Sequence, residues 1–158
     1  EENAFASTGF TQFTIPNNVT TIGEGAFSYC SNLESVTLHG NVTMSFILFA
    51  YCPKLKNVTI SEGVTEIGAE TFRECTSLQN VVLPSSVNII RDRAFQNCTS
   101  LLTLTCNATT VPTLASHNTG ENYNLHFYNI PSSCILKRPN GVDYSAWNDY
   151  FKGGIEDL

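Results

Sequence analysis

Four cysteines, Cys30, Cys52, Cys75 and Cys98, are spaced 22, 23 and 23 residues apart. Regularly spaced thiols can form disulfides, bind a metal ion or pack as small apolar groups. Residues one repeat apart on stacked strands lie about 4.8 Å apart with parallel side chains. That places their Cβ atoms beyond the usual disulfide range of about 3.5–4.5 Å, and a linear column cannot surround zinc tetrahedrally. The spacing therefore favours a column of buried thiols.

The other residues whose side chains could act in catalysis or bind a metal do not form a recognisable motif. Cys106 and Cys134 lie outside the column, and either a disulfide between them or two buried thiols fits the sequence. His39, His117 and His126 are widely spaced without a Cys or Glu at metal-ligand spacing, and we interpret them as loop or strand-end residues. Nucleophile-elbow, phosphate-loop and zinc-protease motifs are absent. We predict no catalytic residue, no cofactor and no metal site.

The column cysteines belong to a longer repeated pattern. Its first complete copy reads Ala26-Phe27-x-x-Cys30-x-x-Leu33-x-x-Val36-x-Leu38, and three similar copies contain the other cysteines. A repeat of this length predicts a solenoid, in which each unit buries its apolar side against its neighbours. The period-two ending predicts a short strand in every coil, and stacked copies predict a parallel sheet. A second apolar pair, such as Val64 and Ile67, predicts an opposite wall.

Two features of the sequence bear on the turns between these walls. One is the position of the glycines, and the other is an irregular unit. Gly23 and Gly68 follow the second wall, where we expect a positive φ. The unit spanning residues 39–49 is one residue short and lacks the Ile-Gly step. Its additional apolar residues, Phe46, Ile47 and Leu48, are interpreted either as a bulged turn or as an exposed patch that contacts a partner.

The period divides the chain into two regions. Residues 1–106 hold about 4.5 repeats and begin mid-repeat, because Phe10, Phe13 and Ile15 fall at the positions of Leu33, Val36 and Leu38. We therefore expect a signal peptide, and further repeats with it, to be absent from this chain. Residues 107–158 break the period. The spacing Tyr144-x-x-Trp147-x-x-Tyr150-Phe151 predicts a short helix that caps the last coil.

The complete unit, Pro-x-x-Val-x-x-Ile-Gly-x-x-Ala-Phe-x-x-Cys-x-x-Leu-x-x-Val-x-Leu, resembles the BspA-like, or Treponema-type, leucine-rich repeat. The resemblance covers residues 4–106, and the stretch 106–114 is similar to the junction that follows the last repeat in this family. Val111 and Lys137-Arg138-Pro139 depart from the family pattern. The resemblance implies a leucine-rich repeat solenoid, β-rich within the α/β class, with right-handed coils of about 23 residues, a parallel sheet on one face and a C-terminal cap. It also implies surface display, with adhesion or protein recognition and no enzymatic activity.

Residues that flank the central position of each strand form the candidate binding face. None of them is charged, so they predict a neutral surface that can hydrogen-bond to a protein or glycan. The alternative is an ordinary exposed sheet, because Thr suits a pleated surface. The face comprises Gln12, Thr14, Ser35, Thr37, Asn57, Thr59, Asn80, Val82, Thr103 and Thr105.

Composition limits the class of partner. The net charge of −6 disfavours nucleic acid, and no apolar run is long enough for direct membrane insertion. We expect a monomeric, extracellular or cell-surface module that recognises a protein or glycan on host or neighbouring cells. The alternative function is a structural spacer that projects another domain and has no ligand of its own.

Overall fold

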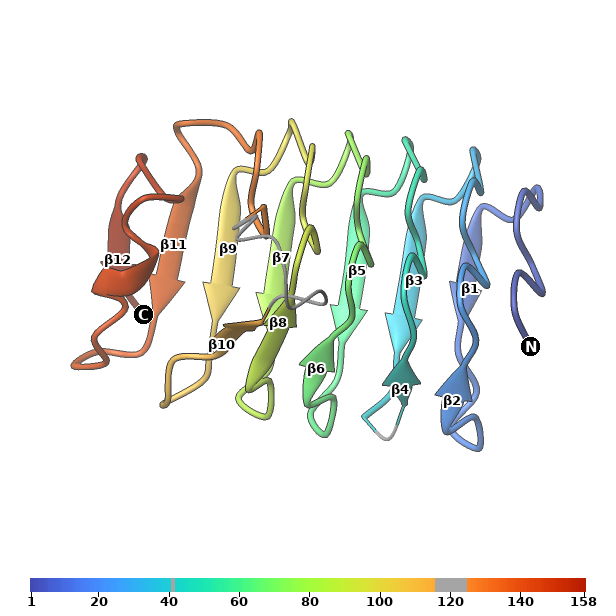
Figure 1. The fold of residues 1–158 in the computed structure, drawn as a ribbon, viewed down its shortest axis with the longest axis horizontal. Coiled ribbons are helices and arrows are strands. Elements are labelled where there is room, and N and C mark those ends of the chain that lie inside the picture. Colours follow the sequence, from blue (N-terminus) through green and yellow to red (C-terminus); the bar gives the residue numbers. More distant parts are fainter. Residues whose placement is uncertain (41, 116–124) are drawn as a thin grey trace.

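The protein is a β-solenoid whose coils stack along the long axis, with the two termini at opposite ends (Figure 1). The computed structural model describes residues 1–40, 42–115 and 125–158. One wall is a seven-stranded parallel sheet with the order β1-β3-β5-β7-β9-β11-β12. Its strands are β1 (Gln12–Thr14), β3 (Ser35–Leu38), β5 (Asn57–Ile60), β7 (Asn80–Leu83), β9 (Thr103–Cys106), β11 (Ile135–Arg138) and β12 (Ile155–Asp157). The expected solenoid with a parallel sheet on one face is confirmed.

The opposite wall consists of shorter strands in two separate sheets. A two-stranded sheet contains β2 and β4, and a three-stranded sheet has the order β10-β8-β6. These strands are β2 (Thr21–Ile22), β4 (Thr43–Met44), β6 (Glu66–Ile67), β8 (Ile89–Arg91) and β10 (Thr113–Ala115). Within the described residues the helical structure is one 3₁₀ helix, Ser145–Trp147, so the fold is β-rich as expected.

Phenylalanines form a continuous column through the core. The rings of Phe27, Phe49, Phe72, Phe95 and Phe127 stack in order, with successive ring centroids 5.4, 5.8, 5.5 and 5.5 Å apart. All five side chains are buried. Each contributes about 1.5–3 kcal/mol by burial, but only when the next coil covers it. The column therefore makes stacking, rather than any single coil, the source of stability.

The cysteine column runs beside the phenylalanines and confirms the interpretation of the thiols as buried groups. Each thiol donates a hydrogen bond to the carbonyl oxygen of the phenylalanine in the preceding coil, for example Cys75 to Phe49 and Cys98 to Phe72, both at 3.2 Å. Burial raises the pKa of the Cys52 thiol to about 12. Cys106 and Cys134 are also free and buried. Of the two alternatives for this pair, two buried thiols are therefore present rather than a disulfide.

Residues 46–48 keep the backbone hydrogen bonds of a regular coil, so the interpretation as a bulged turn was wrong, while a partner contact through these residues stays a prediction. Met44 pairs with Ile22 and takes the place of the usual isoleucine. The Leu48 side chain is fully buried, and its carbonyl oxygen accepts the Phe27 N–H at 3.0 Å, continuing the ladder between coils. Phe46 and Ile47 are half-buried. The second wall is interrupted between β4 and β6, which belong to separate sheets.

The expectation of a positive φ at Gly23 and Gly68 was also wrong, since neither residue has one. Both glycines are required because neighbouring coils approach too closely for a side chain. A Cβ atom on Gly68 would lie 2.6 Å from the Ser45 carbonyl oxygen, and one on Gly23 would lie 2.3 Å from the Glu1 carbonyl oxygen. Positive φ occurs instead at the residues that precede the column cysteines, such as Tyr29.

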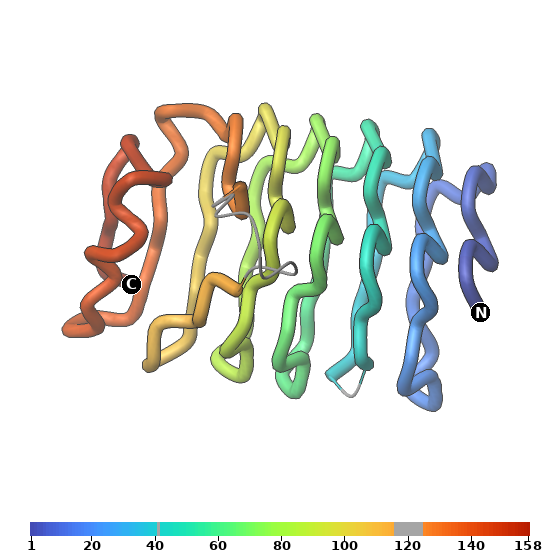
Figure 2. Tube along the Cα trace, viewed as in Figure 1, coloured from blue at the N-terminus to red at the C-terminus, as the bar shows by residue number. Residues whose placement is uncertain are grey.

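The C-terminal region closes one end of the solenoid. Tyr144, Trp147 and Phe151 are buried, and the rings of Trp147 and Phe151 contact Phe127, the last ring of the column. The Tyr144 hydroxyl donates to the Ala108 carbonyl oxygen at 3.0 Å. In the tube view this region folds back over the end of the stack (Figure 2). The aromatic residues thus cap the last coil, as their spacing predicts. The division into two domains at residue 106 stays a prediction.

Candidate functional site

The sheet brings all ten residues of the candidate binding face together in two registered rows. In both rows the side chains point outward, because they alternate with buried residues along each strand. Six of the ten residues are exposed and the other four are half-buried. The first row is Gln12, Ser35, Asn57, Asn80 and Thr103, and the second is Thr14, Thr37, Thr59, Val82 and Thr105.

Strand β11 continues this face beyond the residues that the sequence identified. Ile135 pairs with Thr103 and Lys137 with Thr105, so each row gains one residue. The Lys137 ammonium lies 4.0 Å from a carboxylate oxygen of Glu156 on β12. The repeat period ends before β11, which is why these residues were missed. The alternation of Ile135, Leu136 and Lys137 was the available signal. The neutral face therefore ends in a charged pair.

Ion pairs join neighbouring coils outside the sheet face. Glu66 accepts two hydrogen bonds from Arg91, and Glu70 accepts from Arg73 at 2.8 Å and from Arg93 at 3.1 Å. Burial raises the pKa of Glu70, but the hydrogen bonds and charges of Arg73 and Arg93 lower it further, so the net shift is downward. Because these side chains are partly exposed, each pair contributes below about 1 kcal/mol. Their arrangement is that of structural links between coils.

A pair of tyrosines, one exposed and one half-buried, lies on the turns that precede the cysteines. The rings of Tyr29 and Tyr51 stack with centroids 4.7 Å apart and planes 3° from parallel. The Arg73 guanidinium lies over the Tyr51 ring, 5.4 Å from its centroid. The sequence placed no aromatic residue on the candidate face, and the structure agrees. It locates this pair elsewhere, at the residues directly before Cys30 and Cys52.

The histidines do not form a site together. His39 follows β3, as expected of a strand-end residue. His126 lies in a turn, as expected of a loop residue, but its side chain is buried, with Nε2 3.3 Å from the Ala115 carbonyl oxygen. Burial lowers the pKa of His126 below its ordinary value. His117 lies outside the described residues. Across residues 1–40, 42–115 and 125–158, no cluster of three metal-ligating side chains occurs.

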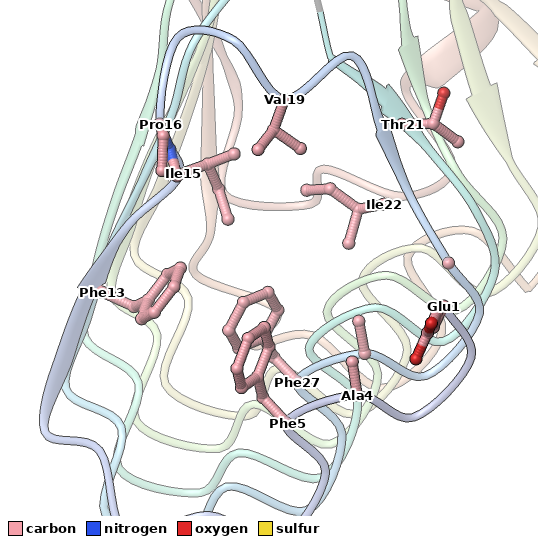
Figure 3. Close-up of a pocket in the computed structure, with 12 residues that line it drawn as sticks. Glu1, Ala4, Phe5, Phe13, Ile15, Pro16, Val19, Thr21, Ile22 and Phe27 are labelled. Carbon is pink, nitrogen blue, oxygen red and sulfur yellow. The ribbon is translucent and has the colours of Figure 1, made fainter.

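The N-terminal end of the solenoid contains an open apolar cavity of about 300 Å³. Phe13 and Ile15 extend into it from the sheet wall, Ile22 from the second wall, and the rings of Phe5 and Phe27 stack beside them (Figure 3). Phe5 and Phe10 are each 39% exposed. This end therefore differs from the C-terminal end, where Tyr144, Trp147 and Phe151 are buried. Among the described residues, no helix has the length and apolarity to cross a membrane.

Comparison with protein families identifies six copies of the BspA type leucine-rich repeat region over residues 1–118. No curated protein is similar enough to the chain to be counted as a relative.

Solved structures with the same fold come from several bacteria. A leucine-rich cell surface protein from Faecalibacterium prausnitzii is 25% identical, with 92% of this chain and 36% of that chain covered and a TM-score of 0.69. A leucine-rich repeat protein from Bacteroides ovatus is 24% identical, with 99% and 44% covered and a TM-score of 0.61. The pneumococcal vaccine antigen PcpA is 15% identical, with 95% and 42% covered and a TM-score of 0.71. The chain spans less than half the length of each of these proteins.

Proposed function

Because the chain belongs to the BspA-type leucine-rich repeat family, we propose that it is a non-catalytic recognition module displayed outside the cell. The similar protein from Faecalibacterium prausnitzii is a leucine-rich cell surface protein, which supports this location. The partner is a protein or glycan on a host or neighbouring cell, and the module binds it as a monomer, by adhesion through its repeat surface.

The observation that carries the proposal is the pair of registered rows on the sheet. Ten uncharged side chains repeat on one face of a rigid stack, and most of them carry a hydroxyl or amide group. Such groups can donate and accept hydrogen bonds without the desolvation cost of a buried charge. By contrast, Glu66 is paired with Arg91 and Glu70 with Arg93, so few hydrogen-bonding groups of these side chains remain for a partner.

The experiment is an array of matrix proteins, cell-surface proteins and glycans probed with the purified chain. Thr59→Lys and Thr37→Lys place a charge in the middle of the face and should abolish binding to whichever ligand the array identifies. Thr65→Lys is the matched control, because Thr65 is exposed outside the sheet face and gives the same change of charge. Binding that survives both sheet-face substitutions would exclude this face. A blank array would favour the spacer that projects another domain.

A further inference from the structure

A row of six residues runs along one set of turns, at the position directly before each column cysteine and at its equivalents in the outer coils. We call this row the turn ridge. Each member has a φ between 58° and 61°. The N–H of each of the first five donates to a carbonyl oxygen of the following coil, for example Tyr29 to Ala50 at 2.9 Å. The members therefore occupy equivalent positions one coil apart, and they are Ser7, Tyr29, Tyr51, Glu74, Asn97 and Asn129.

In the C-terminal half of the turn ridge, the side chains bind their neighbours along the row. The Asn97 amide donates to a carboxylate oxygen of Glu74, and the Asn129 amide donates to the Asn97 side-chain oxygen at 3.0 Å. The spacing between coils, about 4.8 Å, brings equivalent side chains within reach of one another. A position on the ridge is therefore filled by a contact with the next coil wherever the side chains are long enough.

The N-terminal half of the turn ridge is a stack that stays open at one end. The Tyr29 ring stacks on Tyr51 from the preceding coil, and the Arg73 guanidinium lies over Tyr51 from the following coil, 5.4 Å from the ring centroid. Among the described residues, Tyr29 itself has a stacked ring on one side only. On its other side the equivalent residue is Ser7, whose side chain is too short to cover a ring. Tyr29 is accordingly 56% exposed, whereas Tyr51 is half-buried.

The open face of Tyr29 results from the identity of residue 7 and not from the position of the first residue of the chain. Ser7 belongs to a described coil, and its N–H donates to the Ser28 carbonyl oxygen at 2.9 Å, in the same pattern as the other ridge residues. An aromatic ring at position 7 would close the stack, as Tyr29 closes it for Tyr51. The serine therefore leaves a fixed aromatic ring with one face free.

The residues that adjoin this ring face in the chain and in the preceding coil carry hydroxyl and amide groups. Ser7 and Thr8 belong to the preceding coil, and the exposed Asn32 lies in the turn that follows Tyr29. The Asn32 side-chain oxygen accepts a hydrogen bond from Lys54 at 2.9 Å, which leaves its amide N–H groups as donors. A sugar ring matches this chemistry, because it has a face of C–H groups and hydroxyls at its edge. A cationic ligand would be favoured by carboxylates, which these side chains do not supply.

We propose that the open face of Tyr29 is a carbohydrate-binding subsite, on which one sugar ring of an oligosaccharide stacks over Ser7. Because Tyr29 is already held by its stack on Tyr51, little ordering is needed when the sugar binds. Hydroxyls at the edge of the sugar bond to the side chains of Ser7 and Asn32. The subsite lies on the turns rather than on the sheet, so it is additional to the proposed binding face and independent of it.

The probes are short soluble oligosaccharides built from glucose, galactose, mannose or N-acetylglucosamine. We expect at least one of them to shift the Tyr29 ring signals in NMR spectra of the intact chain, in a saturable way. Tyr29→Ala should weaken that binding at least about 10-fold, whereas Tyr29→Phe keeps the ring and should stay within about 3-fold of wild type. Tyr128→Ala is the matched control, because Tyr128 is 55% exposed but lies outside the turn ridge, and its loss should leave binding unchanged.

Ser7→Tyr tests the open face without removing Tyr29. The φ of 58° at Ser7 equals that at Tyr29, so the backbone at position 7 accepts a tyrosine. The new ring should continue the stack, preserve the melting temperature and abolish the response of the Tyr29 ring signals to the sugar. A Tyr29 ring that still responds in this variant would overturn the proposal.

Other results would also overturn the proposal. These are the absence of saturable binding for all of the oligosaccharides, wild-type affinity in Tyr29→Ala, and a Tyr29 ring that responds to arginine amide or a phenylalanine-containing peptide but to no sugar. Thr37→Lys and Thr59→Lys on the sheet face should leave sugar binding at Tyr29 unchanged. Failure of this proposal is therefore distinguishable from failure of the proposed function.

Discussion

Replacing Cys75 by serine should remove part of the protein's sensitivity to alkaline pH. The Cys75 side chain has no exposed surface, and its thiol donates to the Phe49 carbonyl oxygen at 3.2 Å. Burial, together with the charges that Cys98 and Cys52 would carry, raises the pKa of Cys75 well above 9.0. Serine keeps a hydrogen-bond donor at this position but does not titrate.

The sign of the effect follows from proton binding in the two states. Above pH 9 the thiol of the unfolded chain loses its proton, while the native thiol keeps it. The unfolded state then binds fewer protons, so stability falls as the pH rises from the unfolded pKa toward the native one. Between pH 8 and pH 10 one such thiol lowers the free energy of unfolding by about 1.4 kcal/mol.

The size of the total effect comes from the repeat. Cys52, with a pKa of about 12, and Cys134, with a pKa of about 11, are fully buried, and burial also raises the pKa of Cys98. With Cys75 these thiols account for about 5 kcal/mol between pH 8 and pH 10, a large share of the roughly 5–15 kcal/mol typical of a domain. Alkaline unfolding should therefore be steep in the wild-type protein.

The assay is urea unfolding followed by circular dichroism at pH 8 and pH 10, with a reducing agent present. The loss of stability between the two pH values should be about 1.4 kcal/mol smaller in Cys75→Ser than in wild type. Cys75→Ala should show the same reduced pH dependence but lower stability at both values, because it also lacks the hydrogen bond to Phe49. If Cys75→Ser loses as much stability as wild type over this range, the buried thiol is not the titrating group.

Three further outcomes test the coil contacts. Gly68→Ala should lower the free energy of unfolding by about 2 kcal/mol or more, because its Cβ would lie 2.6 Å from a backbone oxygen of the neighbouring coil. Gly9→Ala, with no atom within 4 Å, should have little effect, and equal losses would contradict the packing argument. Tyr144→Phe should cost about 1–2 kcal/mol in thermal unfolding, because the Ala108 carbonyl loses its buried donor; an unchanged melting temperature would speak against this bond. Iodoacetamide at pH 8 should modify the native chain slowly and the urea-unfolded chain at all six cysteines, as mass spectrometry can measure, whereas fast native labelling would show that the column is accessible.

The sequence was sufficient for features that repeat from one coil to the next. The column of Phe27, Phe49 and Phe72 and the outward rows such as Thr37 and Thr59 follow from period and alternation alone. Each coil in a solenoid contacts only its neighbours, so position within the repeat determines position in space. The interpretation of the cysteines as a buried column rested on the same geometry and was confirmed.

Features that depend on distance between coils, or that occur once, were decided by the tertiary structure. The need for glycine at position 68 arises from a backbone oxygen of Ser45, 23 residues away, and no local pattern reveals that approach. The burial of His126 and the addition of β11 and β12 to the sheet lie where the period has ended. In the short unit, Met44 pairs with Ile22 although one residue is missing, and the order of the strands in the large sheet is unchanged.

The sequence by itself therefore determined the repeat, the identity of the buried columns and the residues of the sheet face. Only the tertiary structure decided how the stack ends. The last coil is covered by Tyr144 and Trp147, and charged β12 follows β11 in the sheet. The physical reason is that a repeat encodes contacts between equivalent residues, whereas the last coil meets a cap that has no equivalent in the repeat.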